Sequence, residues 1–343
     1  MKAVQVLSHG NPREVIGVSD IPMPEPGAGE ARVAVSAAAL NFGDIARTRG
    51  GVATVMLKPP FTLGMDVCGV VEAAGAGAES WIGHRVVGMT KMALGGLAER
   101  ALVPVDGLFD APPELDDAQA AAFLLPFHVS YLALQVRAQL KSGEALLVSG
   151  AASGVGSAAV QLGAACGTKV IALVGGAEKA AYCKELGAAA SVDYAEDLFE
   201  RVMQLTGGRG ADVAFDVVGG ELTDKIWSVM ALEGRYLPVG FNADAQGGFT
   251  GRALRKVSMG NFSVLGVMLA YGRTPAPMRR MGLNLYPPEV GAQVHASLRA
   301  LLAQGQLRPP AVRRVRMAEV GAALEEHEAR RTRGRTVVDI AAG

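Results

Sequence analysis

The sequence predicts an α/β protein in which a β-rich part is followed by a parallel, doubly wound sheet. Up to about residue 110, short β-prone runs are separated by Gly and Pro clusters, which is typical of a small barrel or sandwich. From about residue 127, apolar runs alternate with helical stretches, and this alternation indicates βαβ units. Residues 269–343 contain β-prone runs again, so we expect this tail to return to the first part.

The first part is expected to consist of short strands. They are Val4–Leu7, Ala31–Ala37, Gly69–Ala73, Arg85–Met89 and Glu99–Val103. Acidic residues at 110–117 precede an expected helix at 118–123, in agreement with the preference of carboxylates for helix N-termini.

The middle part and the tail carry the remaining expected elements. Strands are expected at 144–149, 170–174, 190–193, 212–218 and 235–240, and helices at 157–166, 177–186, 196–205 and 221–232. The apolar run 262–268 would supply a sixth strand. In the tail we expect a helix near 289–304, a strand at 312–315, a charged helix at 317–330 and a last strand at 336–340.

Length and composition limit the classes of function. The 343 residues suffice for two domains, and half of them are hydrophobic. Lys plus Arg and Asp plus Glu both number 33, so the net charge of zero disfavours a dedicated nucleic-acid binder. The three cysteines are odd in number and far apart, which fits a reducing compartment. No signal peptide and no uncharged apolar run of 18 residues stands out, so we expect a cytoplasmic protein without membrane or nucleic-acid partners.

Residues 144–179 have the pattern of a dinucleotide-binding segment. An apolar strand is followed by the turn GAASGVG (150–156), a helix expected from Ser157, and a second apolar strand. Small residues in the turn let the backbone approach a pyrophosphate, and the helix N-terminus directs free N–H groups at it. A glycine-rich string alone would fit a tight structural turn. The complete strand–turn–helix–strand context predicts a bound dinucleotide.

Several ordered motifs resemble one superfamily. The segments AALNFGDIARTRG (38–50), PPFTLGMDVCGVVEAAG (59–75), HRVVG (84–88), GGLAERALVP (95–104), SYLALQVRAQLKSGEALLVSGAASGVGSAAVQLGAACGTKVIA (130–172) and DVVGGE (216–221) are similar to the medium-chain dehydrogenases/reductases. The resemblance is greatest to the zinc-independent quinone oxidoreductase branch, which includes ζ-crystallin-like proteins. It implies a GroES-like catalytic domain (1–123 and 269–343), a Rossmann domain (124–268) and an active site in the cleft between them. It also implies a dimer or tetramer that pairs sheet edges, and we expect a homodimer through the edge near 262–268.

The resemblance makes the metal question specific. Zinc-dependent relatives carry a cysteine near the NFGD segment and a His-Glu pair after the next glycine, where this chain has Asn41, Met65 and Asp66. A catalytic zinc needs about three converging ligands, and Asn and Met are poor substitutes. The four-cysteine structural lobe is missing too, because no cysteine lies between residues 69 and 165. We therefore predict no zinc, and we interpret Cys68 as a buried core thiol.

The end of the second Rossmann strand bears on the choice of dinucleotide. NAD specificity usually requires an acid there, but Val174 is followed by Gly175, Gly176 and Ala177. Lys179 can reach a 2′-phosphate, and Tyr194 matches a family tyrosine that contacts the same phosphate. The alternatives are a solvated helix lysine and a packing tyrosine. Together with the missing acid, both residues favour NADPH as the cofactor.

The resemblance also implies a set of site residues. Asn41, Asp44 and Ser130 would position the nicotinamide or a small-molecule substrate, and Arg335 would close over the cofactor, although Arg333 is an equal claimant. The implied cofactor contacts are Asn41, Val129, Ser153, Gly154, Val155, Gly175, Lys179, Tyr194, Gly240, Phe241, Leu265, Gly266, Val267 and Arg335. Val129 stands where relatives often have Thr, and Phe42 stands where some enoyl reductases of the superfamily have a catalytic Tyr.

The favoured function is NADPH-dependent transfer of a hydride to a quinone or a similar activated conjugated acceptor. Quinone reduction needs no dedicated acid, which agrees with the absence of an obvious acid–base dyad. A 2-enoyl thioester or enone reductase is the alternative, and it needs a proton at the neighbouring carbon. A set of basic residues is either a solvated face or an anion site for a phosphate-bearing acyl thioester or the cofactor; they are Arg252, Arg255, Lys256, Arg273, Arg279 and Arg280. A crystallin-like or RNA-binding protein is a third interpretation, disfavoured by the lack of an aromatic–basic stripe.

Overall fold

The computed structural model describes residues 1–51, 57–241, 243 and 254–341, and it divides into two compact units. The first unit comprises Met1–Leu125, Ala270–Arg299 and Pro309–Gly343, and the second comprises Pro126–Leu269 and Ala300–Arg308. Residues 300–308 were expected in the first domain, but they group with the second unit. One reason is that the N–H of Arg308 donates a hydrogen bond of 2.7 Å to the side chain of Gln161 in that unit.

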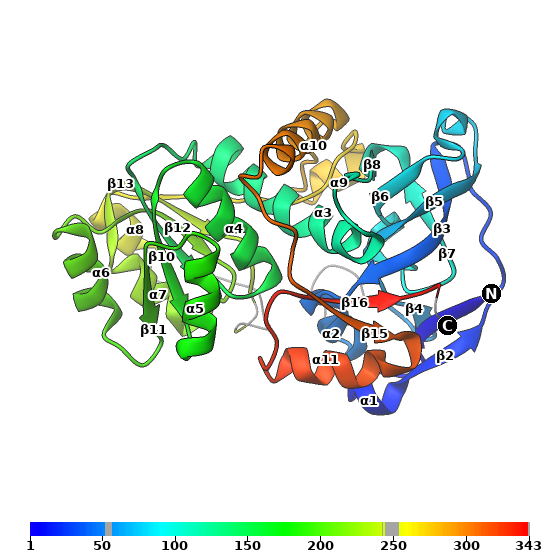
Figure 1. The fold of residues 1–343 in the computed structure, drawn as a ribbon, viewed down its shortest axis with the longest axis horizontal. Coiled ribbons are helices and arrows are strands. Elements are labelled where there is room, and N and C mark those ends of the chain that lie inside the picture. Colours follow the sequence, from blue (N-terminus) through cyan, green and yellow to red (C-terminus); the bar gives the residue numbers. More distant parts are fainter. Residues whose placement is uncertain (52–56, 242, 244–253, 342–343) are drawn as a thin grey trace. The chain divides into compact units, whose positions relative to one another are not determined.

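The first unit is built mainly from strands (Figure 1). Its elements are β1 (Lys2–Val6), α1 (Pro12–Val15), β2 (Ile16–Asp20), β3 (Glu30–Ala39), α2 (Phe42–Thr48), β4 (Phe61–Thr62), β5 (Asp66–Ala74), η1 (Glu79–Trp81), β6 (Arg85–Met89), η2 (Lys91–Ala93), β7 (Arg100–Pro104), η3 (Val105–Gly107), β8 (Leu108–Asp110), α9 (Ala276–Arg280), α10 (Pro288–Ala303), β15 (Val312–Arg316), η5 (Met317–Glu319), α11 (Val320–Glu328) and β16 (Arg335–Asp339). Helix α3 (Asp117–Tyr131) begins in this unit and ends in the second, and the last residues of α10 (300–303) also group with the second unit.

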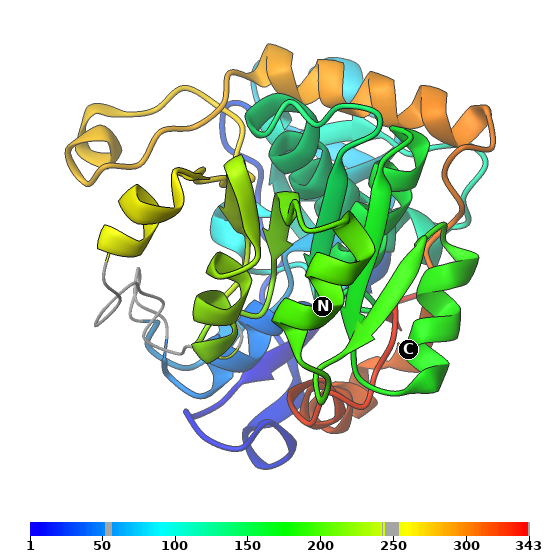
Figure 2. The same ribbon diagram turned by 90° about the vertical axis from the view of Figure 1, so that its left-hand side faces the viewer.

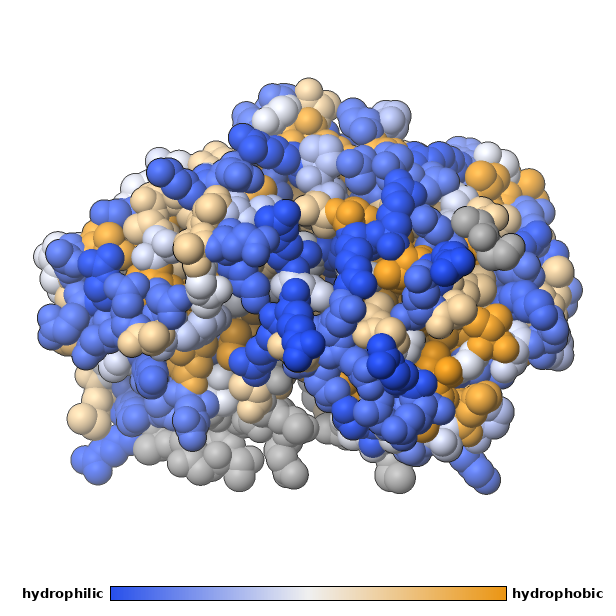
Figure 3. Space-filling model, turned by 60° about the horizontal axis from the view of Figure 1, so that its bottom comes forward, coloured by the Kyte–Doolittle hydropathy of each residue, from blue (hydrophilic) through white to orange (hydrophobic). Residues whose placement is uncertain are grey.

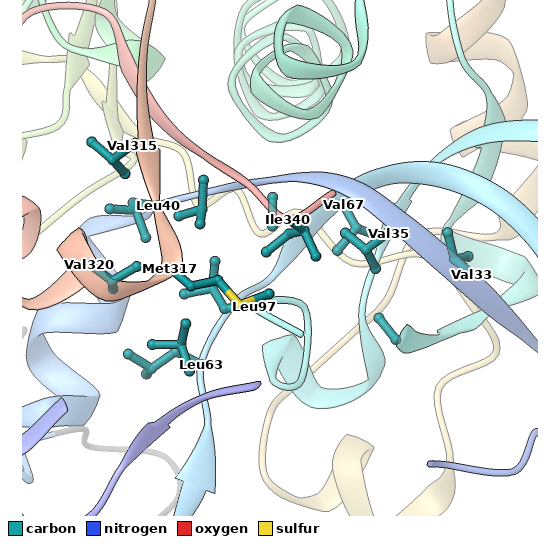
Figure 4. Packing of buried hydrophobic residues seen from close by; sticks show 14 of the residues in the cluster. Val33, Val35, Leu40, Leu63, Val67, Leu97, Val315, Met317, Val320 and Ile340 are labelled. Carbon is teal, nitrogen blue, oxygen red and sulfur yellow. The ribbon is translucent and has the colours of Figure 1, made fainter. Parts of the chain in front are cut away.

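Two sheets organise the first unit. One has the strand order β15-β16-β3-β5-β6-β8 with β7 also paired to β3, and the other has the order β2-β1-β4. Every second residue of β3 from Ala31 to Val35 is buried, as expected for a strand with one face on a core. Figure 4 shows Val33 and Val35 in one apolar cluster with Met317 and Ile340 from the tail. The tail therefore returns to the first part, as the sequence predicted.

The second unit is a parallel sheet with helices. Its elements are η4 (Leu132–Arg137), β9 (Ala145–Ser149), α4 (Gly154–Ala165), β10 (Lys169–Val174), α5 (Ala177–Glu185), β11 (Ala190–Asp193), α6 (Leu198–Thr206), β12 (Ala211–Asp216), α7 (Glu221–Trp227), β13 (Met230–Pro238), α8 (Arg255–Gly260) and β14 (Ser263–Val264). All pairs in the order β11-β10-β9-β12-β13-β14 are parallel. This is the doubly wound order with a switch point between β9 and β12, and it confirms the predicted fold class.

Both faces of this sheet are covered, as Figure 2 shows. Leu147, Ile171 and Leu173 belong to one cluster with residues of α6 and α7. Leu146 and Val170 alternate with them along β9 and β10, and Gly163 of α4 lies against these two side chains. Because alternate side chains point to opposite faces, α4 covers the face opposite α6 and α7. Burial on both faces explains why these strands are continuous apolar runs.

Some expected elements differ from the observed ones. Helix α4 begins at Gly154, three residues before the expected start, because Ser153 is its N-cap and accepts a hydrogen bond from Gly156 N–H. Helix α7 ends at Trp227 rather than at residue 232, because β13 already begins at Met230. The expected strand 262–268 is reduced to Ser263–Val264. Helix α2 and strand β2 lie in segments for which no element was expected.

One helical stretch corrects the expectation about apolar runs. The helical stretch Asp117–Arg137 is long and apolar enough to cross a membrane. However, 72% of the apolar 18-residue window within it is buried inside the protein. Burial of this extent is what the core helix of a folded domain shows, so packing accounts for its composition. The face of the molecule in Figure 3 is mainly hydrophilic, with hydrophobic residues in scattered groups.

Candidate active site

Three strand ends in the first unit bring distant polar residues together. Ala39, near the end of β3, pairs with Asp66 of β5 on one side and with Val337 of β16 on the other. The chain leaves β3 at Leu40, and Asn41 becomes the N-cap residue of α2. The antiparallel registers therefore place Asn41 beside the first residues of β5 and β16, which are Asp66 and Arg335.

Asn41, Asp44, Asp66 and Arg335 form a buried polar cluster. Arg335 donates from Nη1 to Asn41 Oδ1 at 2.9 Å and from Nη2 to Asp66 Oδ2 at 2.7 Å. Asn41 donates from its side-chain amide to Asp66 Oδ2 at 3.3 Å and to the carbonyl of Ala39 at 3.2 Å. Its backbone N–H donates to Asp44 Oδ2 at 2.8 Å. Both carboxylates are fully buried, and Asn41 and Arg335 are each 6% exposed.

Burial dominates the electrostatics of the cluster. It raises the pKa of Asp66 to about 6, although the Arg335 guanidinium acts in the opposite direction. Burial also raises the pKa of Asp44, against the attraction of Arg47, whose Nη1 lies 3.7 Å from Asp44 Oδ1. The same desolvation lowers the pKa of Arg335. Within the described part of the chain, Asp44 Oδ1, Asp66 Oδ1 and Arg335 Nε have no hydrogen-bond partner. Opposite charges stabilise the cluster, but some of its buried polar atoms make no hydrogen bond.

These contacts bear on the roles expected for Asn41 and Arg335. The amide of Asn41 already accepts from Arg335 and donates to two oxygens, so its orientation is fixed by residues of its own unit. Arg335 is likewise engaged through both terminal nitrogens. Each can reach a cofactor only through its remaining hydrogen-bonding capacity or by rearrangement of the cluster.

In the second unit, the glycine turn after β9 is tightly folded. A Cβ on Gly156 would lie 2.2 Å from the carbonyl oxygen of Gly150, so a side chain there would separate the turn from α4. Gly154 and Val155 are the first residues of α4, so their N–H groups have no acceptor within the helix, whereas Gly156 N–H donates to the Ser153 hydroxyl. Ser130 is fully buried, and its hydroxyl donates to the carbonyl of Val155 at 3.2 Å. Ser130 lies near the end of α3.

The ends of β10 and β11 lie beside this turn. The Tyr194 hydroxyl accepts a hydrogen bond of 2.9 Å from Gly150 N–H, so Tyr194 and the glycine turn are in direct contact. A Cβ on Gly175 would lie 3.7 Å from the Tyr194 ring, which places these two predicted residues side by side. Lys179 is the third residue of α5 and is half-buried. Val129, on α3, is 8% exposed.

The loops after β12 and β13 complete the carboxyl edge of the sheet. A Cβ on Gly240 would lie 2.5 Å from the carbonyl oxygen of Val217, and one on Gly150 would lie 2.6 Å from the Val217 side chain. These close approaches join the loops after β9, β12 and β13 at the switch point. Phe241 is 42% exposed. Beyond β14, Leu265 N–H donates to Tyr236 O at 2.8 Å, the Gly266 carbonyl accepts from Arg137 at 2.9 Å, and Val267 is half-buried.

Asp216 is a site residue that sequence reasoning did not single out. Its buried carboxylate accepts hydrogen bonds from Ser149, Tyr236 and Thr223, and from the N–H groups of Val218 and Gly219. One carboxylate thus fixes the end of β9, the loop after β12 and strand β13. The segment DVVGGE, which contributed to the resemblance, contained the available signal.

Comparisons with known proteins decide the family. The alcohol dehydrogenase GroES-like domain matches residues 27–113, and the zinc-binding dehydrogenase domain matches residues 154–281. A quinone oxidoreductase of Pseudomonas aeruginosa is 32% identical over 341 residues, which are 98% of this chain and 99% of that protein. The chain belongs to the quinone oxidoreductase branch of the medium-chain dehydrogenases/reductases. It is therefore an oxidoreductase, and the resemblance inferred from its motifs is confirmed.

Two further relatives extend this assignment. A quinone oxidoreductase-like protein 2 homolog of Nematostella vectensis is 36% identical over 220 residues, which are 63% of this chain and 59% of that protein. The structure of Escherichia coli quinone oxidoreductase complexed with NADPH has a TM-score of 0.85 and 26% identity, and the match covers 99% of this chain and 100% of that chain.

The donor set of this family member does not fit zinc. Among residues 1–51, 57–241, 243 and 254–341, no three His, Cys, Asp or Glu side chains form a group that could hold a metal ion. The ligand positions of zinc-dependent relatives hold Asn41 and Asp66, both engaged by Arg335, and Met65. Cys68 is fully buried in β5, and burial raises the pKa of its thiol to about 12. That zinc is absent remains a prediction.

Two other features of this family member lie outside the predicted site residues. A cavity of about 480 Å³ lies in the first unit. It is lined by Trp81, Val105, Asp106, Leu108, Phe109, Asp110, Pro288, Glu289, Ala292, His295, Ala296 and Arg299.

Of the basic residues considered for an anion site, Lys256 pairs with Asp224 at 2.9 Å, and Arg252 lies outside the described residues.

Proposed function

We propose that this chain is an NADPH-dependent reductase that transfers a hydride to a quinone or a similar activated conjugated acceptor. The observation that carries the proposal is the edge formed by the loops after β9, β12 and β13. Gly156 and Gly240 keep side chains away from closely packed backbone there, and Gly150 leaves room for the Val217 side chain. Such an edge at the switch point of a doubly wound sheet is where dinucleotides bind. The quinone oxidoreductase relatives supply the reaction class.

The residues present fit a dinucleotide. The first turn of α4 offers N–H groups and a positive dipole end, so Ser153, Gly154 and Val155 would hold the pyrophosphate. Lys179 and Tyr194 would approach the 2′-phosphate, and residues 265–267 and 240–241 would flank the nicotinamide. When bound, NADPH supplies the hydride. The protein supplies position and exclusion of water.

The reaction proposed here needs no protein acid. An acceptor quinone takes up one hydride and one proton and becomes a hydroquinone, and the proton can come from water. Asn41 and Ser130 are held by Arg335 and by the Val155 carbonyl, which suits positioning rather than proton transfer. The Cys68 thiol is buried with a raised pKa, so it is a poor nucleophile.

The test uses stereospecifically deuterated NADPH with a panel of quinones, enones and enoyl thioesters. With an enone, we expect deuterium at the reduced carbon and turnover that persists in Cys68→Ala. Ser130→Ala should lose activity by less than the roughly 10²–10⁴-fold typical of an obligatory general acid. Deuterium missing from the product, or a folded but inactive Cys68→Ala, would contradict the proposal. Turnover restricted to enoyl thioesters would favour the alternative substrate class.

We further propose that two copies pair through the β14 edge of the second unit. Strand β14 ends the sheet order and pairs on one side with β13. Leu232 of β13 and Met259 of α8 are 74% and 73% exposed, so both apolar side chains are accessible to a second copy. Light scattering should give a dimer mass for the wild type and for Leu7→Glu, and a monomer mass for the double variant Leu232→Glu/Met259→Glu. A monomeric wild type would overturn this pairing.

A further inference from the structure

The turn after β10 carries a carboxylate that does not come from β10. Val174, the last residue of β10, is in register with Asp193, the last residue of the neighbouring strand β11. Asp193 accepts a hydrogen bond of 2.7 Å from Gly176 N–H through Oδ2 and one of 2.9 Å from Ala195 N–H through Oδ1. Gly176 has a φ of +83° and directly precedes α5. The end of the second strand, β10, has no acidic residue of its own, but Asp193 of the third strand, β11, places a carboxylate there.

The carboxylate is negative and has hydrogen-bonding capacity left. The N–H groups of Gly176 and Ala195 hold the pKa of Asp193 below its usual range. A carboxylate has about four acceptor sites, of which these N–H groups use two. A ribose hydroxyl could therefore still donate to Asp193. A dianionic phosphate at the same place would meet a like charge.

Two contacts connect Asp193 with the cofactor site. Its neighbour Tyr194 accepts from Gly150 N–H, in the turn assigned to the pyrophosphate. Asp193 also accepts a hydrogen bond from Gly176 N–H. The preceding residue, Gly175, lies beside the Tyr194 ring. In doubly wound dinucleotide sites the adenosine ribose lies between the pyrophosphate turn and the end of the second strand. Asp193 lies at that end.

We propose that Asp193 is a specificity-determining residue that binds the adenosine ribose of NADH and opposes the 2′-phosphate of NADPH. The inference rests on the proposed dinucleotide site and deepens it. Lys179 attracts the 2′-phosphate and Asp193 repels it, so the wild type binds both cofactors with only a moderate preference for NADPH.

The test is Asp193→Asn with a matched control. Asparagine keeps an oxygen that can accept from Gly176 N–H and removes the charge. Asp197→Asn is the control, because Asp197 also accepts from backbone N–H groups, those of Phe199 and Glu200, at the start of α6. Asparagine caps helices as well as aspartate does. Dissociation constants for NADPH and NADH are measured by fluorescence titration for all three proteins.

We expect Asp193→Asn to bind NADPH about fivefold more tightly and NADH more weakly, so that their affinity ratio rises at least tenfold. In Asp197→Asn the ratio should stay within twofold of the wild type. An equal change for both cofactors in Asp193→Asn would show that Asp193 only shapes the turn, and the inference would fail while the proposed function stands. Should that variant not fold, Asp193→Ser, whose hydroxyl also accepts, replaces it with the same expected shift. A folded wild type that binds neither cofactor would refute the proposed function itself.

Discussion

Removing Arg335 should destabilise the first unit strongly, and removing its partner as well should restore most of the loss. Asp66 is fully buried, and the Arg335 side chain that neutralises it at 2.7 Å is 7% exposed. Breaking such a pair leaves an uncompensated buried charge, which costs about 3–5 kcal/mol. Arg335→Met is therefore expected to lose that amount. The double variant Arg335→Met/Asp66→Leu has no buried charge at this pair, so we expect a coupling free energy of at least about 2 kcal/mol.

The chain's two tryptophans allow this to be measured in one unit. Trp81 lies in the first unit and Trp227 in the second, so a Trp227→Phe background leaves a fluorescence probe of the first unit. Urea unfolding of the wild type, both single variants and the double variant in this background gives the coupling free energy. A loss below about 1 kcal/mol for Arg335→Met, or no recovery in the double variant, would refute the account of the cluster.

The same variants decide between Arg335 and Arg333 as the cofactor contact. The double variant should recover stability whether or not Arg335 touches the cofactor. If Arg335 contacts NADPH, the stable double variant binds NADPH more weakly, and Arg333→Met does not. If Arg333 is the contact, Arg333→Met alone loses affinity. Because Arg335 is buried and engaged at both terminal nitrogens, we expect the loss in Arg333→Met.

The remaining predictions concern metal content, cofactor choice and acid stability. Elemental analysis should find far less than one equivalent of zinc, and a chelator should leave activity intact; stoichiometric zinc lost together with activity would contradict this. Lys179→Ala should weaken NADPH binding by about 10- to 100-fold and spare NADH, whereas an equal loss for both would make Lys179 structural. Burial lowers the pKa of His295 from 6.5 to about 4, so the unfolded chain binds a proton that the folded chain does not, and stability falls as the pH falls from 6.5 to 4. His295→Gln should reduce this loss by up to about 3 kcal/mol, measured by urea unfolding across that range; an unchanged pH slope would disprove it.

The fold was largely predictable because its signals are local. Strands β9 and β10 are apolar on both faces, and Ser153 and the glycines around it mark the start of α4. The strand expected at 262–268 failed for a reason that is not local. Its apolar composition favours a strand, but β14 pairs with β13 only through Ser263 and Val264. Strand propensity describes a half-buried, paired surface and does not say whether a partner extends alongside.

Contacts among the candidate site residues were predictable only where the residues are neighbours in the sequence. Asn41 and Arg335 are 294 positions apart, and only the registers of β3 with β5 and β16 bring them together. The sequence therefore marked both as cofactor contacts without indicating that they bind each other. Asp193 was overlooked for a related reason, because the usual rule inspects the end of the second strand. The carboxylate reaches that place from the third strand, through a pairing that the sequence does not state.

The buried polar cluster gives the expected absence of zinc a physical basis beyond missing ligands. A metal at the family's ligand positions would need donor atoms from Asn41 and Asp66. Asn41 Oδ1 and Asp66 Oδ2 are the atoms to which Arg335 donates. A metal that bound through these two atoms would therefore compete with the Arg335 guanidinium for them. The positive charge of Arg335 already compensates the Asp66 carboxylate. A metal cation at this place would therefore be repelled by the Arg335 guanidinium.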